Sequence, residues 1–325
     1  SQRFLLILVV LLVWAILGFY RYHQGKKAEQ ELNQALAGSV QLQAEKEAEA
    51  QELKEKFRQA FTLINKRSEH QLLSRLPWYM IIGSPGCGKT TLLANSGLDF
   101  PLAGQLGEPA VKGIGGTKNC DWWFSRGAVL LDTAGRYTSR DSHSELDRAA
   151  WEQFLHLIRK FRKKPINGVL VAIGVDELLT ATPGTLSEQI NAARQRVSEL
   201  NTCFKVKLPV YVLLTKTDLL PGFSEFFENF GYREREQVFG MTFKETAPAA
   251  VMAEFDVQFP ALMQSLCRKQ WRRMEQERDS GRKKSIYLFS HQVAALKNAL
   301  KELLSAFAHE DEYTRGGIAR GVYFT

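Results

Sequence analysis

The sequence predicts an α/β fold with a mostly parallel sheet and flanking helices, and three observations lead to it. The first is a phosphate-binding loop of the form G-x-x-x-x-G-K-[ST], Gly83 to Thr90, between an apolar run and a segment of helical composition. The second is an apolar run that ends in Asp-Thr-Ala-Gly at residues 132–135. The third is a pair of apolar runs, 168–175 and 208–214, typical of strands buried on both faces. This order of elements is that of a Ras-like P-loop NTPase.

The N-terminal part begins with an uncharged apolar stretch from Phe4 to Tyr20, at the short end of what spans a bilayer as a helix. The positive segment Arg21 to Lys27 follows, which predicts that the C-terminal flank faces the cytoplasm. We therefore expect a transmembrane helix at 1–22, with a buried core helix and a signal peptide as the alternatives. Because the chain opens on Ser rather than Met, we expect its true start to lie further upstream.

Residues 23–76 are dominated by Ala, Glu, Gln, Lys and Leu, with apolar side chains at helical intervals. This pattern predicts a helical stalk or hairpin between the bilayer and the next domain, with a break at Gly38-Ser39 as one possibility. Pro77 is expected to end it. We then expect the nucleotide-binding domain at 77–245 and a C-terminal helical extension at 246–325.

Within these two segments the alternation of apolar patterns predicts further strands and helices. The expected strands are a hairpin of 119–125 and 128–132 joined by Arg126-Gly127, and a last strand at 238–243; the expected helices are 147–162, 189–200, 252–277 and 292–307.

Charge and cysteine content restrict the class of protein. The net charge is +8, and much of it lies in the runs 159–164 and 268–284. No base-stacking module accompanies these runs, so we expect no nucleic-acid partner; anionic lipid headgroups or plain solvated helix faces are the alternatives. The four cysteines are too widely spaced to suggest a zinc site or a disulfide framework, which fits a reducing cytoplasm.

The phosphate-binding loop defines the first group of candidate residues. Its glycines, Gly83, Gly86 and Gly88, let the backbone curl so that successive N–H groups point at a phosphate. Lys89 is expected to reach the β- and γ-phosphates and the Thr90 hydroxyl to ligate Mg²⁺, with Thr91 beside it. The alternative is a glycine-rich turn without a ligand.

The Asp-Thr-Ala-Gly segment supplies the second group. Asp132 is expected to hold Mg²⁺ through water, and the Gly135 N–H to meet the γ-phosphate. Between the two groups lies a glycine-rich stretch, from which Thr117 is the candidate for a switch-type metal ligand. Arg136 stands where Ras-like enzymes place a water-orienting Gln. Since a guanidinium has no acceptor, we expect slow hydrolysis, with Arg136 either stabilising phosphoryl charge or pairing with a neighbour.

A third group, Thr215-Lys216-Thr217-Asp218, follows a buried strand and has the form of a guanine-recognition motif. The Asp218 carboxylate would accept two hydrogen bonds from guanine, and the Lys216 stem would pack on the base. Thr215 occupies the position where Asn is commoner. We expect GTP rather than ATP, with ATP left open.

With these residues assembled, the chain resembles the TssM/IcmF family of inner-membrane proteins of type VI secretion systems. The resemblance is carried by residues 76–79, 83–98, 116–124 (Gly-Thr-Lys-Asn-Cys-Asp-Trp-Trp-Phe), 130–138, 162–170, 209–218 and 320–325. It implies a fragment of a larger protein: a transmembrane helix and a cytoplasmic domain, followed in full members by another span and a periplasmic part. It also implies a TssL/DotU-type partner in the bacterial inner membrane, a TssJ-type lipoprotein, baseplate components and a homo-oligomer.

Three functions fit these residues. In the first, Lys89, Asp132 and Arg136 serve an NTPase that drives a step in secretion. In the second, the domain is a membrane scaffold that docks partners, with a structural or vestigial nucleotide site, as degenerate loops in the family imply. The third, a membrane-docked targeting GTPase, leaves the segment Trp122-Trp123 unexplained.

Overall fold

The computed structural model describes residues 47–48, 51–52, 54–55, 76–100, 120–138, 145–162, 166–308 and 316–325. The predicted transmembrane helix at 1–22, nearly all of the predicted stalk at 23–76, and Thr117 lie outside these residues. Among the residues that are described, none of the helices has the length and apolarity that a membrane crossing requires. Ser1–Glu52 and Leu53–Thr325 are two separate compact units, and everything below concerns the second.

The described part of this unit contains a seven-stranded sheet in the order β2-β3-β1-β4-β5-β7-β6. The five inner strands run parallel, and β2 and β6 pair antiparallel at the two edges. This confirms the predicted mostly parallel α/β class and the predicted hairpin, which is β2 and β3. The strands are β1 Trp78–Ile82, β2 Cys120–Phe124, β3 Val129–Thr133, β4 Gly168–Gly174, β5 Pro209–Thr215, β6 Gly240–Thr242 and β7 Ile318–Phe324.

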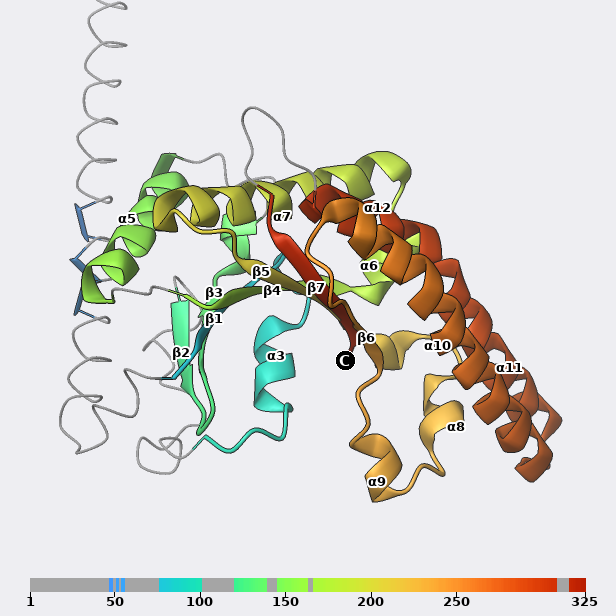
Figure 1. Ribbon diagram of the computed structural model, residues 1–325. Helices are drawn as coiled ribbons and strands as arrows, with labels where there is room; N and C mark the ends of the chain where they lie inside the picture. Colours follow the sequence, from blue (N-terminus) through green and yellow to red (C-terminus); the bar gives the residue numbers. More distant parts are fainter. Residues whose placement is uncertain are drawn as a thin grey trace, which may run out of the picture. The chain divides into compact units, whose positions relative to one another are not determined.

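The helices of the described residues lie on both faces of the sheet and beyond its β6 edge (Figure 1). They are α3 Lys89–Ala94, α5 Glu145–Phe161, α6 Val175–Thr180, α7 Pro183–Phe204, α8 Phe223–Phe227, α9 Tyr232–Arg235, α10 Pro248–Gln276, α11 Ser280–Ala295 and α12 Lys297–Ala308, with short 3₁₀ turns at η1 Gly135–Thr138 and η3 Thr217–Leu219.

Two apolar clusters hold the sheet between its helices. Along β4, Val169, Val171 and Ile173 belong to the larger cluster, with side chains of α5 and α7, whereas Ala172 belongs to a smaller cluster around α3. Alternate residues of one strand therefore serve opposite faces, as the pleat of a strand requires. Figure 1 shows α5 and α7 across one face and α3 on the other. Full burial of each such side chain contributes about 1.5–3 kcal/mol to folding.

The two neighbouring tryptophans of β2 also pack on opposite faces of the sheet. Trp122 packs edge-on against Trp78 at 5.2 Å between ring centroids, and Trp123 packs against Phe100 at 5.2 Å. Both tryptophans are buried. The edge strand is thus anchored to both layers, which explains in structural terms a segment that the nucleotide motifs leave unaccounted for.

The helix α7 starts earlier than the predicted 189–200. Thr182 caps it by accepting a hydrogen bond from the Thr185 N–H, and Pro183 occupies the first turn. Both residue types favour a helix start, because a hydroxyl satisfies a free N–H and proline needs no partner there. The helix α10 likewise begins at Pro248, before the predicted start at 252. The predicted single helix at 292–307 is wrong, since α11 ends at Ala295 and α12 begins at Lys297.

The last strand, β7, was not predicted. It pairs parallel with β5 and antiparallel with β6, so it lies inside the sheet. This strand belongs to the segment 246–325, which is expected from the sequence to be a helical extension. Ala319, Val322 and Phe324 are buried, and Phe324 stacks on Phe239 at 4.4 Å between ring centroids. The predicted strand at 238–243 is shorter in the structure, at Gly240–Thr242.

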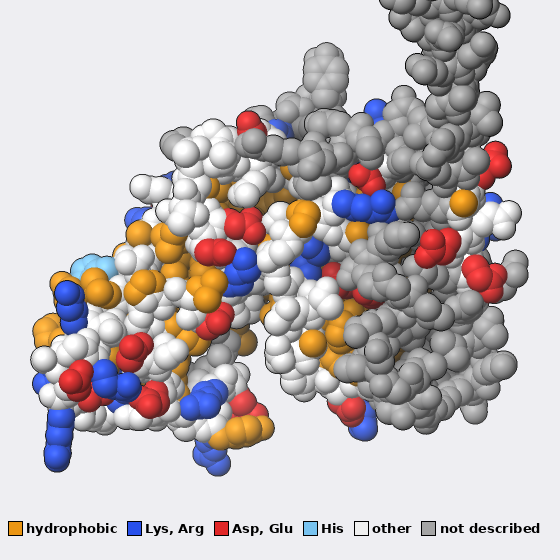
Figure 2. Space-filling view, turned by 180° about the vertical axis from the view of Figure 1, so that it is seen from behind, with side chains coloured by type: hydrophobic (Ala, Val, Ile, Leu, Met, Phe, Trp, Pro, Cys, Tyr) orange, Lys and Arg blue, Asp and Glu red, His pale blue; other side chains and the backbone are white. Residues whose placement is uncertain are grey.

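The basic segment 268–284 lies at the junction of α10 and α11. Arg282 forms ion pairs with Glu228 and Glu277, and Arg273 is buried with its guanidinium donating to the carbonyls of Glu225 and Phe226. Figure 2 shows Lys and Arg side chains interspersed with Asp and Glu side chains on this face of the molecule. Part of the positive charge therefore serves the fold.

Candidate functional site

The loop between β1 and α3 has a backbone that only glycine accommodates at several points. A Cβ on Gly83 would lie 2.3 Å from the carbonyl oxygen of Ala172. Gly86 and Gly88 have φ angles of +75° and +89°, in the left-handed region that side chains disfavour. The Gly-x-x-x-x-Gly pattern is therefore required by this turn, independently of any ligand.

Lys89 begins α3, and its ammonium group lies under the loop. The side chain is buried, and Nζ donates hydrogen bonds to the carbonyls of Gly83 at 2.7 Å and Ser84 at 3.0 Å. Burying an ammonium is costly unless its protons are bonded. Here the loop itself provides the acceptors, so the cation is held at the centre of the turn.

Thr90 and Asp132 come together from α3 and the end of β3. The Thr90 hydroxyl donates to Asp132 Oδ2 at 2.6 Å. Burial raises the pKa of Asp132 from 3.8 to about 6, while the bond from Thr90 and the nearby Lys89 charge act in the opposite direction. The other oxygen, Oδ1, is buried and has no hydrogen-bond partner within the described part of the chain. A buried carboxylate oxygen without a donor is uncommon and favours binding of a cation or water.

Gly135 and Arg136 follow in the turn η1. A Cβ on Gly135 would lie 2.6 Å from backbone atoms of Pro85, so this turn touches the loop and tolerates only glycine. Arg136 is directed elsewhere: its guanidinium forms an ion pair with Asp147 of α5 at 2.9 Å. Of the two roles expected for Arg136, pairing with a neighbour is the one observed in this structure.

The segment 215–218 contacts the same loop from the end of β5. The Thr215 hydroxyl donates to the carbonyl of Cys87, so the threonine that stands where Asn is commoner bonds directly to the loop. Lys216 has a left-handed backbone and an ion pair to Asp176 at 2.9 Å, and the hydrogen bond that its ammonium donates to Asp176 raises the pKa of Lys216. Asp218 is exposed.

Two carboxylates of α6 belong to this site and were missed by sequence reasoning. Asp176 holds Lys216, and Glu177 accepts hydrogen bonds from the Ser84 hydroxyl at 3.1 Å and from the Gln189 side chain at 3.2 Å. Burial raises the pKa of Glu177. Their position in the sequence could have indicated them, because this acidic pair comes directly after the buried strand β4, at the edge of the sheet where the other candidate residues lie.

Most of the predicted residues meet at the loop between β1 and α3, and others do not. Those brought together are Gly83, Gly86, Gly88, Lys89, Thr90, Asp132, Gly135 and Lys216. Thr91 is exposed on α3, and Thr117 lies outside the described residues. The carboxyl ends of β1, β3, β4 and β5 meet here, which is where open α/β sheets place ligands.

Comparisons with known proteins bear on the family. The family model of the IcmF-related N-terminal domain matches residues 144–325. A curated relative, the type VI secretion system component TssM1 of Pseudomonas aeruginosa, is 46% identical over 281 residues. That match covers 84% of this chain and 26% of the relative, so the chain spans about a quarter of its length.

Distant likenesses to solved structures also occur. Two mutation variants of SsGBP match with a TM-score of 0.28 each, at 20% and 16% identity; they cover 46% and 45% of this chain and 42% and 41% of theirs. The family match, in contrast, covers more than half of the chain and agrees with the resemblance carried by its motifs. The chain belongs to the TssM/IcmF family.

Proposed function

We propose that this domain binds a purine nucleoside triphosphate with Mg²⁺ at the loop 83–90, and hydrolyses it slowly. The observation that carries the proposal is the Thr90–Asp132 pair beside Lys89, with one buried Asp132 oxygen that receives no hydrogen bond from the residues that the structure describes. In a glycine-rich turn that binds no ligand, a buried, unsatisfied carboxylate next to a buried ammonium would only cost stability. A second observation is the contact of three separate segments with one loop.

The donor set fits Mg²⁺. Thr90 and Asp132 provide hydroxyl and carboxylate oxygens, which are the ligand types that this ion prefers, and they lie 2.6 Å apart. When bound, Mg²⁺ supplies charge neutralisation for the β- and γ-phosphates. Thr117 remains a proposed additional ligand.

The chain's own groups would hold the rest of the triphosphate. The backbone N–H groups of residues 86–90 would donate to phosphate oxygens, and Lys89 would exchange its bonds with Gly83 and Ser84 carbonyls for bonds to phosphate. The Gly135 N–H would meet the terminal phosphoryl, because its turn already touches Pro85. Such charge-assisted bonds are about twice as strong as neutral ones.

We propose GTP as the preferred nucleotide, with ATP as the alternative. Asp218 is exposed and available to accept two hydrogen bonds from a guanine edge. Lys216 lies beside Gly88, with its stem 3.8 Å from where a Cβ on that glycine would be, so it can cover one face of the base. Its partner Asp176 would keep the ammonium group away from the ring.

Slow hydrolysis follows from Arg136. A guanidinium has no acceptor with which to orient a water molecule, and here it is paired with Asp147. To stabilise charge on a transferring phosphoryl group, Arg136 would first have to leave that carboxylate. This pairing also favours the second candidate, a non-catalytic scaffold in which the nucleotide is structural.

In the cell, we propose that the chain is part of an inner-membrane component of a type VI secretion system, with this domain in the cytoplasm. Membership of the TssM/IcmF family supports this, as does the similarity to TssM1, a type VI secretion system component of Pseudomonas aeruginosa. The proposed partners are a TssL/DotU-type membrane protein, baseplate components, other copies of the chain and, through a periplasmic part, a TssJ-type lipoprotein.

Calorimetric titration with GTP and with ATP, in Mg²⁺ and in EDTA, tests the nucleotide site. We expect saturable Mg²⁺-dependent binding that Lys89→Ala weakens by at least about 100-fold, since removing a buried charge-assisted contact costs about 3 kcal/mol or more. Lys301→Ala, which removes an exposed ammonium paired with Asp256, is the matched control and should bind normally. Asp218→Ala should weaken GTP and spare ATP. No binding of either nucleotide by folded protein would refute the proposal.

Lys89→Ala also separates the two candidate functions in cells. Loss of secretion with an assembled membrane complex would support the NTPase. Normal secretion by a variant that no longer binds nucleotide would support the scaffold function instead.

A further inference from the structure

A half-buried carboxylate of α6, Glu177, is bonded to the start of the loop 83–90. The Ser84 hydroxyl donates to both of its oxygens, at 3.1 Å each. Ser84 is also the residue whose backbone carbonyl, together with that of Gly83, accepts hydrogen bonds from Lys89 Nζ. Glu177 therefore acts on the acceptors of the loop lysine through a single intervening residue.

The later part of the loop is held by neutral contacts. The turn at Gly135 touches the backbone of Pro85. The Thr215 hydroxyl donates to the carbonyl of Cys87. The bond to Glu177 differs from these in having an ionisable acceptor, and hydrogen bonds to ionised groups are about twice as strong as neutral ones.

The groups around Glu177 act on its charge in both directions. Burial raises the pKa of Glu177, and the neighbouring Asp176 carboxylate adds to this effect. The bond from Ser84 and the ammonium groups of Lys216 and Lys89 act in the opposite direction. An isolated half-buried carboxylate would be costly at this edge of the sheet, whereas one that faces two cations and a hydroxyl donor is supported as an acceptor.

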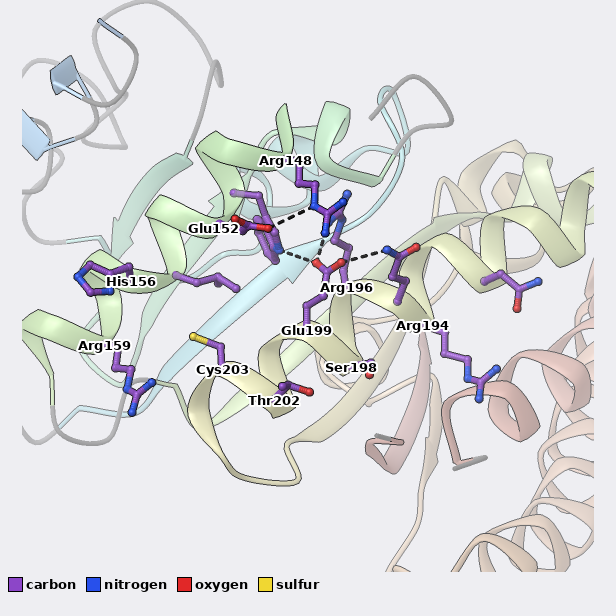
Figure 3. A pocket seen from close by; sticks show the side chains of 14 residues that line it. Arg148, Glu152, His156, Arg159, Arg194, Arg196, Ser198, Glu199, Thr202 and Cys203 are labelled. Atoms are coloured by element: carbon purple, nitrogen blue, oxygen red, sulfur yellow. Dashed lines mark hydrogen bonds and ion pairs between the residues drawn. The ribbon is translucent and has the colours of Figure 1, made fainter. Parts of the chain in front are cut away.

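Glu177 also ties the loop to α7, because Gln189 Nε2 donates to its Oε2 at 3.2 Å. Further along α7, Glu199 accepts hydrogen bonds from Trp151 Nε1 of α5 at 2.7 Å and from Arg196 Nη1 at 2.6 Å. These residues line the groove between α5 and α7 that Figure 3 shows. Gln189 thus belongs to a helix that is itself fixed to its neighbour, which gives Glu177 a firm support.

We propose that Glu177 is a positioning residue of the loop 83–90: it holds Ser84 so that the carbonyls of residues 83 and 84 keep Lys89 in place while the site is empty. A loop that is already ordered loses less conformational freedom when a ligand binds, so this bond raises the affinity for the nucleotide. The gain in affinity rests on the proposed nucleotide site, whereas the order of the empty loop does not depend on it.

Alkylation of Cys87 measures the order of the empty loop directly. The Cys87 side chain is 0% exposed within the loop, and Cys120 is buried in β2. In the full 325-residue chain in detergent, without nucleotide, we expect Glu177→Ala to speed alkylation of Cys87 by iodoacetamide at least about fivefold and to leave Cys120 unchanged, because only the loop opens. Peptide mass spectrometry separates the two cysteines. Faster reaction at both cysteines would show a general loss of stability, and an unchanged Cys87 would show that other contacts order the loop; either result would overturn the proposal.

Titration with GTP and Mg²⁺ measures the effect on affinity. We expect Glu177→Ala and Ser84→Ala each to weaken binding about tenfold, as the loss of one charge-assisted hydrogen bond does. The double variant should bind as weakly as either single variant, because both substitutions remove the same bond. Glu177→Gln keeps an oxygen that accepts from the Ser84 hydroxyl and should bind within about threefold of wild type.

The matched control is a second serine–glutamate bond. The Ser187 hydroxyl of α7 donates to Glu302 of α12 at 3.0 Å, and this bond involves no residue of the loop 83–90. Ser187→Ala and Glu302→Ala should change neither Cys87 alkylation nor nucleotide affinity.

Three results of the titration would overturn the proposal: additive losses in the double variant of residues 84 and 177, a Glu177→Gln variant as weak as Glu177→Ala, or equal weakening by the control variants. If the wild-type chain binds no nucleotide, the proposed function fails, and alkylation of Cys87 alone decides the role of Glu177.

Discussion

At the scale of single residues, Asp132 combines a cost to stability with a proposed role in binding. Its folded-state pKa is raised from 3.8 to about 6 by burial. The folded chain therefore binds this proton more tightly than the unfolded chain does. It follows that the free energy of unfolding falls as pH rises from about 4 to about 6, and stays lower above that range. A pKa difference of this size corresponds to about 3 kcal/mol.

We therefore predict that Asp132→Asn stabilises the nucleotide-free protein at pH 8 by about 1–3 kcal/mol, since the amide removes the buried charge and still accepts from Thr90. The same variant should lose Mg²⁺-dependent nucleotide binding. Urea unfolding at pH 4.5 and pH 8 checks the first part, because the gain should fall to about a third at the lower pH, where the folded-state carboxyl is largely protonated. A variant less stable than wild type at pH 8 would contradict this account.

Gly135 offers a steric test at the same scale. Alanine there would place a Cβ 2.6 Å from the Pro85 backbone, and a backbone cannot move aside as a flexible side chain can. We expect Gly135→Ala to cost about 2–4 kcal/mol by forcing the turn away from the loop. Gly127→Ala is the matched control, because no atom of the described residues lies within 4 Å of its Cβ position. Thermal unfolding of both variants measures the two losses of stability. Equal stabilities of the two variants would show that the contact between Gly135 and Pro85 is not maintained in solution.

At the scale of secondary-structure elements, Arg196 joins α7 to the turn that follows β3. Its guanidinium bonds Glu199 and the carbonyl of Tyr137, one residue from Arg136. We expect Arg196→Met to cost about 2–4 kcal/mol, because the Tyr137 carbonyl loses the hydrogen bond from this guanidinium and the partly buried Glu199 carboxylate loses its charged donor. Arg148→Met removes a pair with Glu152 in which both side chains are exposed, and should change stability by less than about 1 kcal/mol. Urea unfolding measures both; a small effect at Arg196 would show that α7 is held by apolar packing alone.

The elements also show why sequence reasoning succeeded in some places and failed in others. The segments that form β3, β4 and β5 are apolar and bounded by turn residues, so the sequence pattern predicts them as strands. β7 contains Arg320 and Gly321 within seven residues, and its strand character depends on pairing with β5 from more than a hundred residues earlier in the chain. A local pattern cannot contain that information. The break at Leu296 was hidden for a similar reason, since both flanking segments have helical composition.

The candidate site divides in the same way. Gly83, Lys89, Thr90, Asp132 and Gly135 were predictable, because their chemistry is tied to fixed spacing along the chain. Glu177 and Asp176 were not, since their role depends on which strands become neighbours in the sheet. The ion pair between Arg136 and Asp147 links two elements, and the spacing of these residues along the chain does not predict it.

At the scale of the whole molecule, the position of β7 makes the C-terminal segment part of the sheet. β7 separates β5 from β6, and its buried residues Ala319 and Val322 lie in the same apolar cluster as β5 and α10. Phe243 and Phe255, near the predicted boundary at 245, are also in this cluster. A chain ending at 245 would therefore expose one edge of β5 and a large apolar surface.

We predict that the fragment 76–245 does not fold cooperatively, whereas 76–325 does, because the shorter chain loses the apolar contacts of α10, α11, α12 and β7 together. Circular dichroism during urea titration and limited proteolysis of both fragments measure this. A subtler variant, Val322→Asp in the full chain, should abolish folding by burying an unpaired charge between β5 and β6. Tyr323→Asp, one residue further on the opposite face of the strand and partly exposed, should be tolerated better. If 76–245 instead unfolds in a single sharp transition and retains the loop's nucleotide affinity, the segment 246–325 is an appendage and the sheet is complete without it.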